Sequence, residues 1–273
     1  MSFHLAGLIP LAGHALDFKM PWHDSLMPIG PDYLAVERSV VECANAGCET
    51  IWLICDNDVQ PLIRHRLGEY VQDPVWVTRH YSPRKGEHKK PIPLYYVPLN
   101  IRDKGKKDSL SWSILHGSYI ANKISSKMSF WLKPDKFFVS FPYGYYGPTL
   151  VRQYRDIISN NKNFFISHDD KTIIDGEYLG FTFDGEDYKN LLKNFREVYS
   201  SELHKTNLNF SLETIFGILN RKSANVVDIM NYWKIDNWED YCKYMTEQGP
   251  RTKRPSEYIL KYHEWNDIGV DED

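Results

Sequence analysis

LAGLIPLAG, residues 5–13, is the stretch that decides the fold of this chain. It is an uncharged apolar run that ends at Gly13, which is typical of a strand buried on both faces of a sheet. Apolar residues at helical spacing follow over 33–46, and Gly47 is a helix stop. The β-branched and aromatic residues of 50–55 predict a second strand. This order predicts a βαβ unit and a ligand beyond the carboxyl ends of its strands.

The rest of the chain continues the alternation of strand and helix patterns. Further strands are predicted at 75–77, 92–99, 136–141, 164–168 and 226–230, helices at 61–70, 108–127, 150–158 and 188–199 and from 208 onward, and a β-hairpin over 171–183 that turns at Asp175-Gly176. We therefore expect an α/β domain over 1–245, with a mixed, mainly parallel central sheet flanked by helices on both faces. Strand 5–12 should lie in the interior of this sheet. Residues 246–273 are expected to form a polar C-terminal tail with a short helix at 256–265.

Composition excludes several classes of protein. At 273 residues and 42% hydrophobic residues the chain can bury a proper core, and its net charge of −3 argues against a nucleic-acid binder. No apolar stretch reaches the roughly 20 residues that span a bilayer, and no signal-peptide pattern is present. The four cysteines form no Cys-x-x-Cys pair and are typical of buried thiols in a reduced, cytoplasmic compartment. We expect neither membrane nor nucleic acid as a partner, and a homo-oligomer stays open.

Two short motifs resemble those of the sugar-phosphate nucleotidyltransferase family, whose fold is Rossmann-like and of GT-A type. They are Leu11-Ala12-Gly13 after the first strand and Leu26-Met27-Pro28-Ile29 before the first helix, separated by a long loop. The resemblance covers roughly residues 5–245. It implies transfer of a nucleotidyl group from an NTP to a sugar phosphate, with release of pyrophosphate. It also implies Mg²⁺ as the cofactor and an NTP or nucleotide-sugar and a sugar phosphate as partners.

The chain departs from the family pattern at three positions. His14 to Asp17 stand where the family has a Gly-Thr-Arg turn, and Asp24 stands in the place of its phosphate-binding lysine. Strand 136–141 is followed by Pro142 and Tyr143, where the family has a Mg²⁺-binding aspartate. Two alternatives to catalysis therefore stay open. One is a degenerate binder of a nucleotide or nucleotide-sugar, and the other is a protein-interaction or assembly protein on the same scaffold.

The resemblance assigns roles to several residues. Nucleotide binding falls to Leu11, Ala12, Gly13, Asp24, Ser109, Ser111, Lys106 and Lys107, sugar binding to Tyr143, Gly144 and Glu177, and catalysis to Lys19 and Asp236, with Asp236 also the metal ligand. The start of the predicted helix at Ser109 is a candidate phosphate site even without the resemblance, because free N–H groups at a helix N-terminus beside a basic loop favour phosphate.

Each assignment has a structural alternative. The basic loops can be solvated charge clusters, and the tyrosine-rich turn after Phe141 can be a packed turn. Asp236 followed by Trp238-Glu239-Asp240 resembles the second signature of the family, but this motif can also be a helix cap formed by Asn237 and Asp240. We expect the largest cavity to be walled by Gly13, the 14–24 loop, Ser109 and Asp236, because ligands of open α/β sheets bind at this edge.

Overall fold

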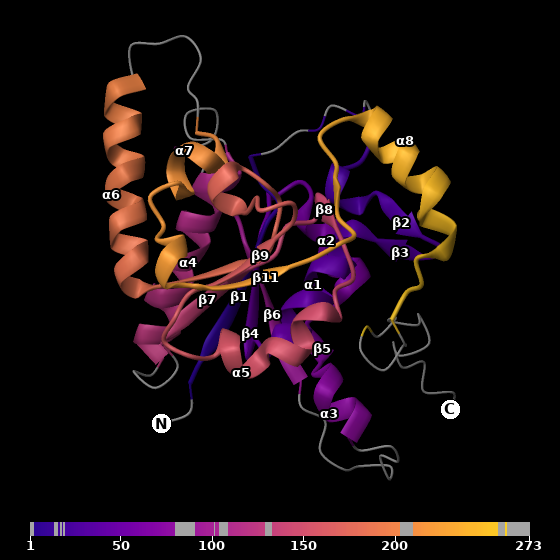
Figure 1. The fold of residues 1–273 in the computed structure, drawn as a ribbon, viewed down its shortest axis with the longest axis horizontal. Coiled ribbons are helices and arrows are strands. Elements are labelled where there is room, and N and C mark those ends of the chain that lie inside the picture. The colour runs from indigo at the N-terminus through magenta and orange to yellow at the C-terminus, as the bar shows by residue number, and fades with distance from the viewer. Residues whose placement is uncertain are drawn as a thin grey trace, which may run out of the picture.

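The computed structural model describes residues 3–13, 16, 18, 20–79, 91–100, 102–103, 109–128, 133–202, 210–255 and 260. Its centre is an eight-stranded sheet in the order β11-β9-β10-β7-β1-β4-β6-β5 (Figure 1). The strands of this sheet are β1 (Leu5–Pro10), β4 (Thr50–Ile54), β5 (Tyr70–Gln72), β6 (Pro91–Val97), β7 (Lys136–Val139), β9 (Phe164–Ser167), β10 (Phe181–Asp184) and β11 (Asn225–Asp228).

The sheet is mixed and mainly parallel, as the sequence predicts. β1 pairs in parallel with both β4 and β7, so the first strand of the chain is an interior strand. β6 continues the parallel set beside β4, and β11 runs parallel to β9. β10 is antiparallel to both of its neighbours, and β5 is antiparallel to β6 at one edge.

Helices cover both faces of the sheet (Figure 1). They are α1 (Ala35–Ala46), α2 (Gln60–Leu67), α3 (Pro74–Arg79), α4 (Leu110–Met128), α5 (Arg155–Ile158), α6 (Gly185–Glu202), α7 (Leu212–Phe216) and α8 (Trp238–Glu247). Figure 1 shows α4, α6 and α7 on one side, where they contact one another, and α1, α3 and α5 on the other. Two small strand pairs complete the fold: β2 (Pro28–Gly30) with β3 (Tyr33–Leu34), and β8 (Gly144–Tyr145) with β12 (Trp233–Lys234).

Two glycines let helices from opposite sides approach the sheet closely. A Cβ atom on Gly7 of β1 would lie 3.0 Å from the sulfur of Cys43 on α1. A Cβ atom on Gly117 of α4 would lie 2.5 Å from Cδ1 of Ile54 on β4. A methyl group at Gly7 would require α1 to shift by a few tenths of an ångström, and one at Gly117 would require the Ile54 side chain to move, so both glycines allow close packing of the layers.

The predicted strand at 75–77 is wrong, because these residues lie in α3. Asp73 accepts a hydrogen bond from the backbone N–H of Val75 (2.9 Å), and Pro74 occupies the first helical position. An Asp followed by Pro is a helix start, and it overrides the β-branched composition of the segment. The predicted helix 61–70 is likewise shorter, since α2 ends at Leu67 and Tyr70 begins β5.

The predicted β-hairpin over 171–183 is also wrong. Residues Ile173–Asp175 form a turn of 3₁₀ helix, and Gly176 ends it in the left-handed region at φ 82°. Thr172 and Asp175 form a reciprocal capping box at its start. The dipeptide Asp-Gly suits a helix end as well as a hairpin turn, because both need a residue with positive φ.

The segment after α8 is attached to the domain near its beginning. A Cβ atom on Gly30 would lie 2.3 Å from the carbonyl oxygen of Thr252, so the two backbones touch. Arg254 lies 3.1 Å from the carboxylate of Glu37 on α1, and Arg66 lies 2.9 Å from the same oxygen of this fully buried side chain. The boundary proposed at 245 falls inside α8, and the short helix expected at 256–265 lies outside the described residues apart from Leu260.

Candidate functional site

The first predicted site residues follow β1. The backbone N–H groups of Leu11 and Ala12 donate to the carbonyl of Ile54 (2.8 and 2.9 Å), and the Ala12 carbonyl accepts from the hydroxyl of Ser113 on α4 (2.6 Å). Leu11 and Ala12 are buried, so they hold the end of β1 against β4 and α4. Gly13 follows in the left-handed region at φ 79° and is the residue of this turn that faces a cavity.

This cavity has a volume of about 390 Å³. Its lining includes Gly13, Ser109, Tyr178, Ser211, Glu213 and Lys234. Ser109 caps α4, because its hydroxyl accepts from the N–H of Trp112 (3.1 Å). The structure therefore brings Gly13 and Ser109, two residues assigned to one site from the sequence, together at the carboxyl edge of the parallel strands.

Lys234 links the other half of the predicted site. Its ammonium nitrogen lies 3.5 Å from Oδ2 of Asp236 and 3.7 Å from Oε2 of Glu177. The same nitrogen lies 5.4 Å from the centre of the Tyr178 ring. Glu177 and Asp236, assigned to the sugar and to the metal, thus share one lysine that we did not predict. No local signal marked this lysine, because β12 is only two residues long and Asp236 lies beyond its end.

Strand pairing holds Lys234 in place. In the β8–β12 pair Lys234 stands opposite Gly144, and the N–H of Ile235 donates to the carbonyl of Tyr143 (3.0 Å). A Cβ atom on Gly144 would lie 2.0 Å from the carbonyl oxygen of Tyr178, so this position admits only glycine. Tyr143 is fully buried, and its ring packs edge-on against Tyr178 at 5.9 Å. Both residues support the cavity wall from behind.

Two tyrosine hydroxyls contact the charged cluster formed by Lys234, Glu177 and Asp236. Burial, together with the charge of Asp236 and a hydrogen bond to it, raises the pKa of Tyr178. Burial and the charge of Glu177 raise the pKa of Tyr232, whose hydroxyl donates to Glu177 (3.2 Å). Both phenols are therefore protonated donors, and each satisfies one of the carboxylates that flank Lys234.

The other assigned residues lie apart from the cavity or outside the described chain. The Ser111 hydroxyl is buried and donates to the carbonyl of Phe210 (3.0 Å). Asp24 accepts from the N–H of Leu16 (2.7 Å), so the aspartate at the lysine position of the family closes the first loop instead. Lys19, Lys106 and Lys107 lie outside the described residues, and their roles stay predictions.

The residues present do not fit a protein-held Mg²⁺ at Asp236. Mg²⁺ requires near-octahedral oxygen ligands at about 2.0–2.1 Å, with one or two of them carboxylates. Asp236 is already engaged by Lys234 and Tyr178, and the turn after β7 offers Phe141, Pro142 and Tyr143. Within the described ranges no group of three or more His, Cys, Asp or Glu side chains could hold a metal ion.

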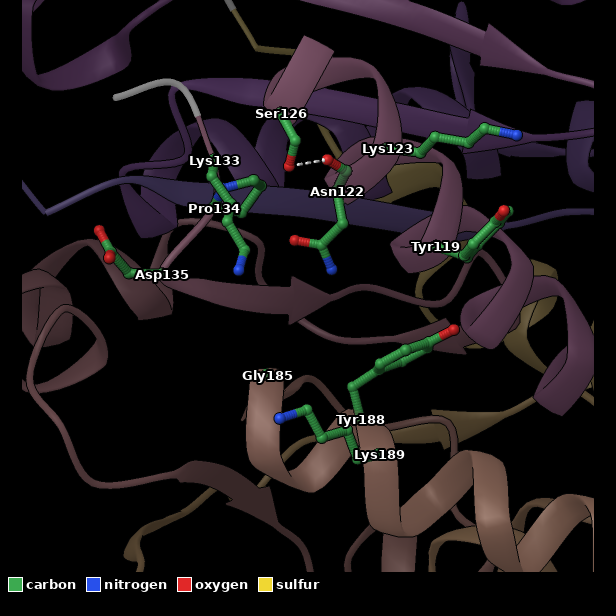
Figure 2. A pocket seen from close by; sticks show the side chains of 10 residues that line it. All are labelled: Tyr119, Asn122, Lys123, Ser126, Lys133, Pro134, Asp135, Gly185, Tyr188 and Lys189. Atoms are coloured by element: carbon green, nitrogen blue, oxygen red, sulfur yellow. Dashed lines mark hydrogen bonds between the residues drawn. The ribbon is translucent and has the colours of Figure 1, made fainter. Parts of the chain in front are cut away.

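The largest cavity described does not lie at this edge, which corrects our expectation. A cavity of about 650 Å³ lies between α4 and the start of α6 (Figure 2). Figure 2 shows Asn122 and Lys133 pointing into it from one side and Tyr188 and Lys189 on the other. It adjoins Asp135, the residue before β7, and so lies at the amino ends of the parallel strands. The size of this cavity results from the gap between α4 and α6 and not from the position of the strand ends.

Comparison with known proteins agrees with the fold. No protein-family model and no curated protein matches the sequence. A candidate glucose-1-phosphate thymidylyltransferase from Bacillus anthracis, in complex with sucrose, aligns with 93% of this chain and 98% of its own, at a TM-score of 0.61 and 8% identity. UTP-bound UGPase from Acinetobacter baumannii aligns with 93% and 95%, at a TM-score of 0.57 and 11% identity. A UDP-glucose pyrophosphorylase complexed with UDP-glucose aligns with 90% and 98%, at 0.55 and 11%.

These likenesses define the fold of the chain. It is the Rossmann-like fold of the sugar-nucleotide nucleotidyltransferases, and it extends over most of the chain. The resemblance given by the two N-terminal motifs is thereby confirmed for the fold. None of the helices in the described part of the chain is both long and apolar enough to cross a bilayer.

Proposed function

We propose that the chain binds an NTP or a nucleoside-diphosphate-sugar in the cavity between Gly13, the start of α4 and Lys234. The observation that carries this proposal is the meeting of a glycine turn, a helix N-terminus and an ammonium group in one cavity at the carboxyl edge of a parallel sheet. Neighbours of the same fold are complexes with UTP and with UDP-glucose.

Each part of the cavity suits a different part of such a ligand. The first N–H groups of α4 and the dipole of this 19-residue helix favour an anion near Ser109. Lys234, which is flanked by Glu177 and Asp236, brings an ammonium group to the lining of the cavity. Tyr178 also lines the cavity, but its side chain is largely buried and its ring packs on Tyr143 and Lys234. The predicted contacts of Lys19, Lys106 and Lys107 belong to the same proposal.

Nucleotidyl transfer is the second candidate, and Lys234 is the observation that favours it. In this reaction an oxygen of a sugar phosphate forms a bond to the α-phosphorus of the NTP, and the bond from that phosphorus to the β-phosphate oxygen breaks. Pyrophosphate leaves with the electron pair. A positive group near the phosphates stabilises the charge that develops, and Lys234 can supply one.

The assembly alternative has less support. It relies on the tyrosine-rich turn after β7 as a contact surface, but Tyr143, Tyr145 and Tyr146 are 0%, 2% and 9% exposed. Tyr143 packs on Tyr178, Tyr145 on Tyr244 of α8 and Tyr146 on Arg38 of α1, so these rings offer little area to a partner.

A thermal-shift panel of NTPs and nucleotide-sugars, with and without Mg²⁺, tests the proposal. A ligand at 100 times its dissociation constant stabilises the folded state by about 2.7 kcal/mol, which is easily measured. We expect at least one nucleotide or nucleotide-sugar to raise the melting temperature. Pyrophosphate release measured on the same panel separates transfer from binding alone. If no compound of the panel changes the melting temperature, the assembly role is favoured instead.

A further inference from the structure

The charged cluster at Lys234 has a definite orientation relative to the cavity. Lys234 lines the cavity, whereas Glu177 and Asp236 are not among its lining residues. The two carboxylates therefore hold the ammonium from outside the cavity lining. Among the described residues that line this cavity, Lys234 is the only cation, and two carboxylates, those of Asp175 and Glu213, line it as well.

The hydrogen-bonding capacity of the ammonium leaves room for a ligand. A lysine ammonium carries three N–H donors and accepts nothing. Asp236 and Glu177, at 3.5 and 3.7 Å, are ion-pair partners at distances longer than a normal hydrogen bond. A phosphate oxygen in the cavity can therefore accept an N–H of the ammonium in a charge-assisted hydrogen bond.

The charge of the cluster is also informative. Asp236 with Lys234 is neutral, and Glu177 gives the three-residue cluster a net charge of −1. The side chain of Glu177 is 14% exposed and accepts a hydrogen bond from the Tyr232 hydroxyl. A divalent cation that approached Asp236 would have to displace an ammonium bound to the same carboxylate.

We infer that Lys234 takes the place of a divalent cation in this site: its ammonium binds the diphosphate of an NTP or a nucleoside-diphosphate-sugar that arrives without metal. This inference rests on the proposed function and adds that binding is independent of metal. It makes Lys234 a binding residue, and it makes Glu177 and Asp236 positioning residues that act through the lysine.

Calorimetric titration with two probes, UDP-glucose and inorganic pyrophosphate, tests the inference. Each probe is titrated in EDTA and again in excess Mg²⁺. We expect the wild-type protein to bind in EDTA, with a dissociation constant within a few-fold of that in Mg²⁺. Lys234→Met keeps the packing on Tyr178 and removes the charge. It should bind about 10- to 100-fold more weakly in EDTA, the range set by one hydrogen bond to a charged group.

Two further variants separate charge from folding. Lys234→Arg keeps a cation and should retain most of the affinity. Lys243→Met is the matched control, because Lys243 also lies over an aromatic ring, that of Trp233 at 5.8 Å, but does not line the cavity. Its affinity should equal that of the wild type. Melting curves of all variants check that each is folded.

The outcomes are distinct. Wild-type binding that vanishes in EDTA would overturn the inference while leaving the proposed function intact. So would equal affinity of Lys234→Met and the wild type in EDTA. If neither probe, nor any compound of the thermal-shift panel, binds the wild type under either condition, the proposed function fails and this inference fails with it.

Discussion

Arg38 and Glu42 form an ion pair one turn apart on α1, with 3.1 Å between Nη2 and Oε2 and side-chain exposures of 1% and 0%. The pair is also the anchor of the turn after β7. Arg38 donates to the carbonyls of Phe141 and Tyr146, both at 3.1 Å. Glu42 accepts from the hydroxyls of Ser140 and Tyr146. A buried pair of charges on one helix thus fixes the backbone that supports β8 and, through it, Lys234.

Glu42→Gln should strongly destabilise the protein. The substitution leaves the Arg38 guanidinium buried without its counter-charge, and breaking a buried ion pair in this way costs about 3–5 kcal/mol. Urea denaturation followed by circular dichroism measures the loss. Glu197→Gln is the control, because its pair with Lys193 is exposed on α6 and should contribute nothing measurable. Equal stability of the two variants would contradict the assignment.

Lys136→Met should destabilise the protein although it replaces a charge by an apolar group of similar size. Lys136 is 2% exposed, and its ammonium donates to the carbonyls of Ile158, Asn160 and Lys162 after α5. Burial lowers the pKa of Lys136 to about 8, so the ammonium is still protonated at neutral pH. The variant leaves three acceptors without their donor, and we expect a loss of about 1–3 kcal/mol at pH 7. An unchanged or raised midpoint in urea would show that water replaces the ammonium without cost.

Asp236→Asn distinguishes a positioning role from a metal-binding role. If Asp236 only orients Lys234, the neutral amide should hold the ammonium less firmly, and pyrophosphate binding in EDTA should weaken by a few-fold. If Asp236 holds Mg²⁺, the same variant should lose any Mg²⁺-dependent binding and pyrophosphate release. The fold should survive, since Asn237 caps α8 by accepting from the N–H of Asp240 (3.0 Å). Calorimetry in EDTA and in Mg²⁺ measures both alternatives.

Lys19→Ala should weaken nucleotide binding and leave the melting temperature nearly unchanged. Lys19 is the nearest cation in sequence to Asp24, which stands at the lysine position of the resembled family. Lysine side chains are rarely buried and usually contribute little to stability, so affinity and melting temperature should separate. The measurement is a titration with the best compound of the thermal-shift panel. Unchanged affinity would remove Lys19 from the site.

Local sequence patterns were sufficient for the elements that build the core. The runs 5–10 and 51–54 are apolar without interruption, and the helix between them ends at a glycine, so the βαβ unit is predicted from local signals. The same local signals fail where one motif suits two structures. Asp175-Gly176 ends a 3₁₀ helix instead of turning a hairpin, and Asp73-Pro74 starts a helix in a segment of strand composition.

Only part of the candidate site was predicted from the sequence. Gly13 and Ser109 follow from motifs that lie at strand ends, and the topology brings them together. Lys234 could not be found in this way, because its position depends on the pairing of β12 with β8, and neither two-residue strand has a periodicity to detect. In the same way, the sequence motif around Asp236 does not indicate that a lysine forms an ion pair with this aspartate.

The contact of Arg254 with Glu37 has a consequence for how the chain is made. Glu37 belongs to α1, which lies between β1 and β4 in sequence, so this unit would be ready to form early during synthesis. Its buried carboxylate is nevertheless balanced by two arginines, and Arg254 is synthesised 217 residues after Glu37. Arg66 and the N–H of Leu34 can bind this carboxylate earlier, but the second balancing charge on the buried group is missing until then. The βαβ unit that contains α1 thus completes its buried ion pairs only after the segment that follows α8 has been synthesised.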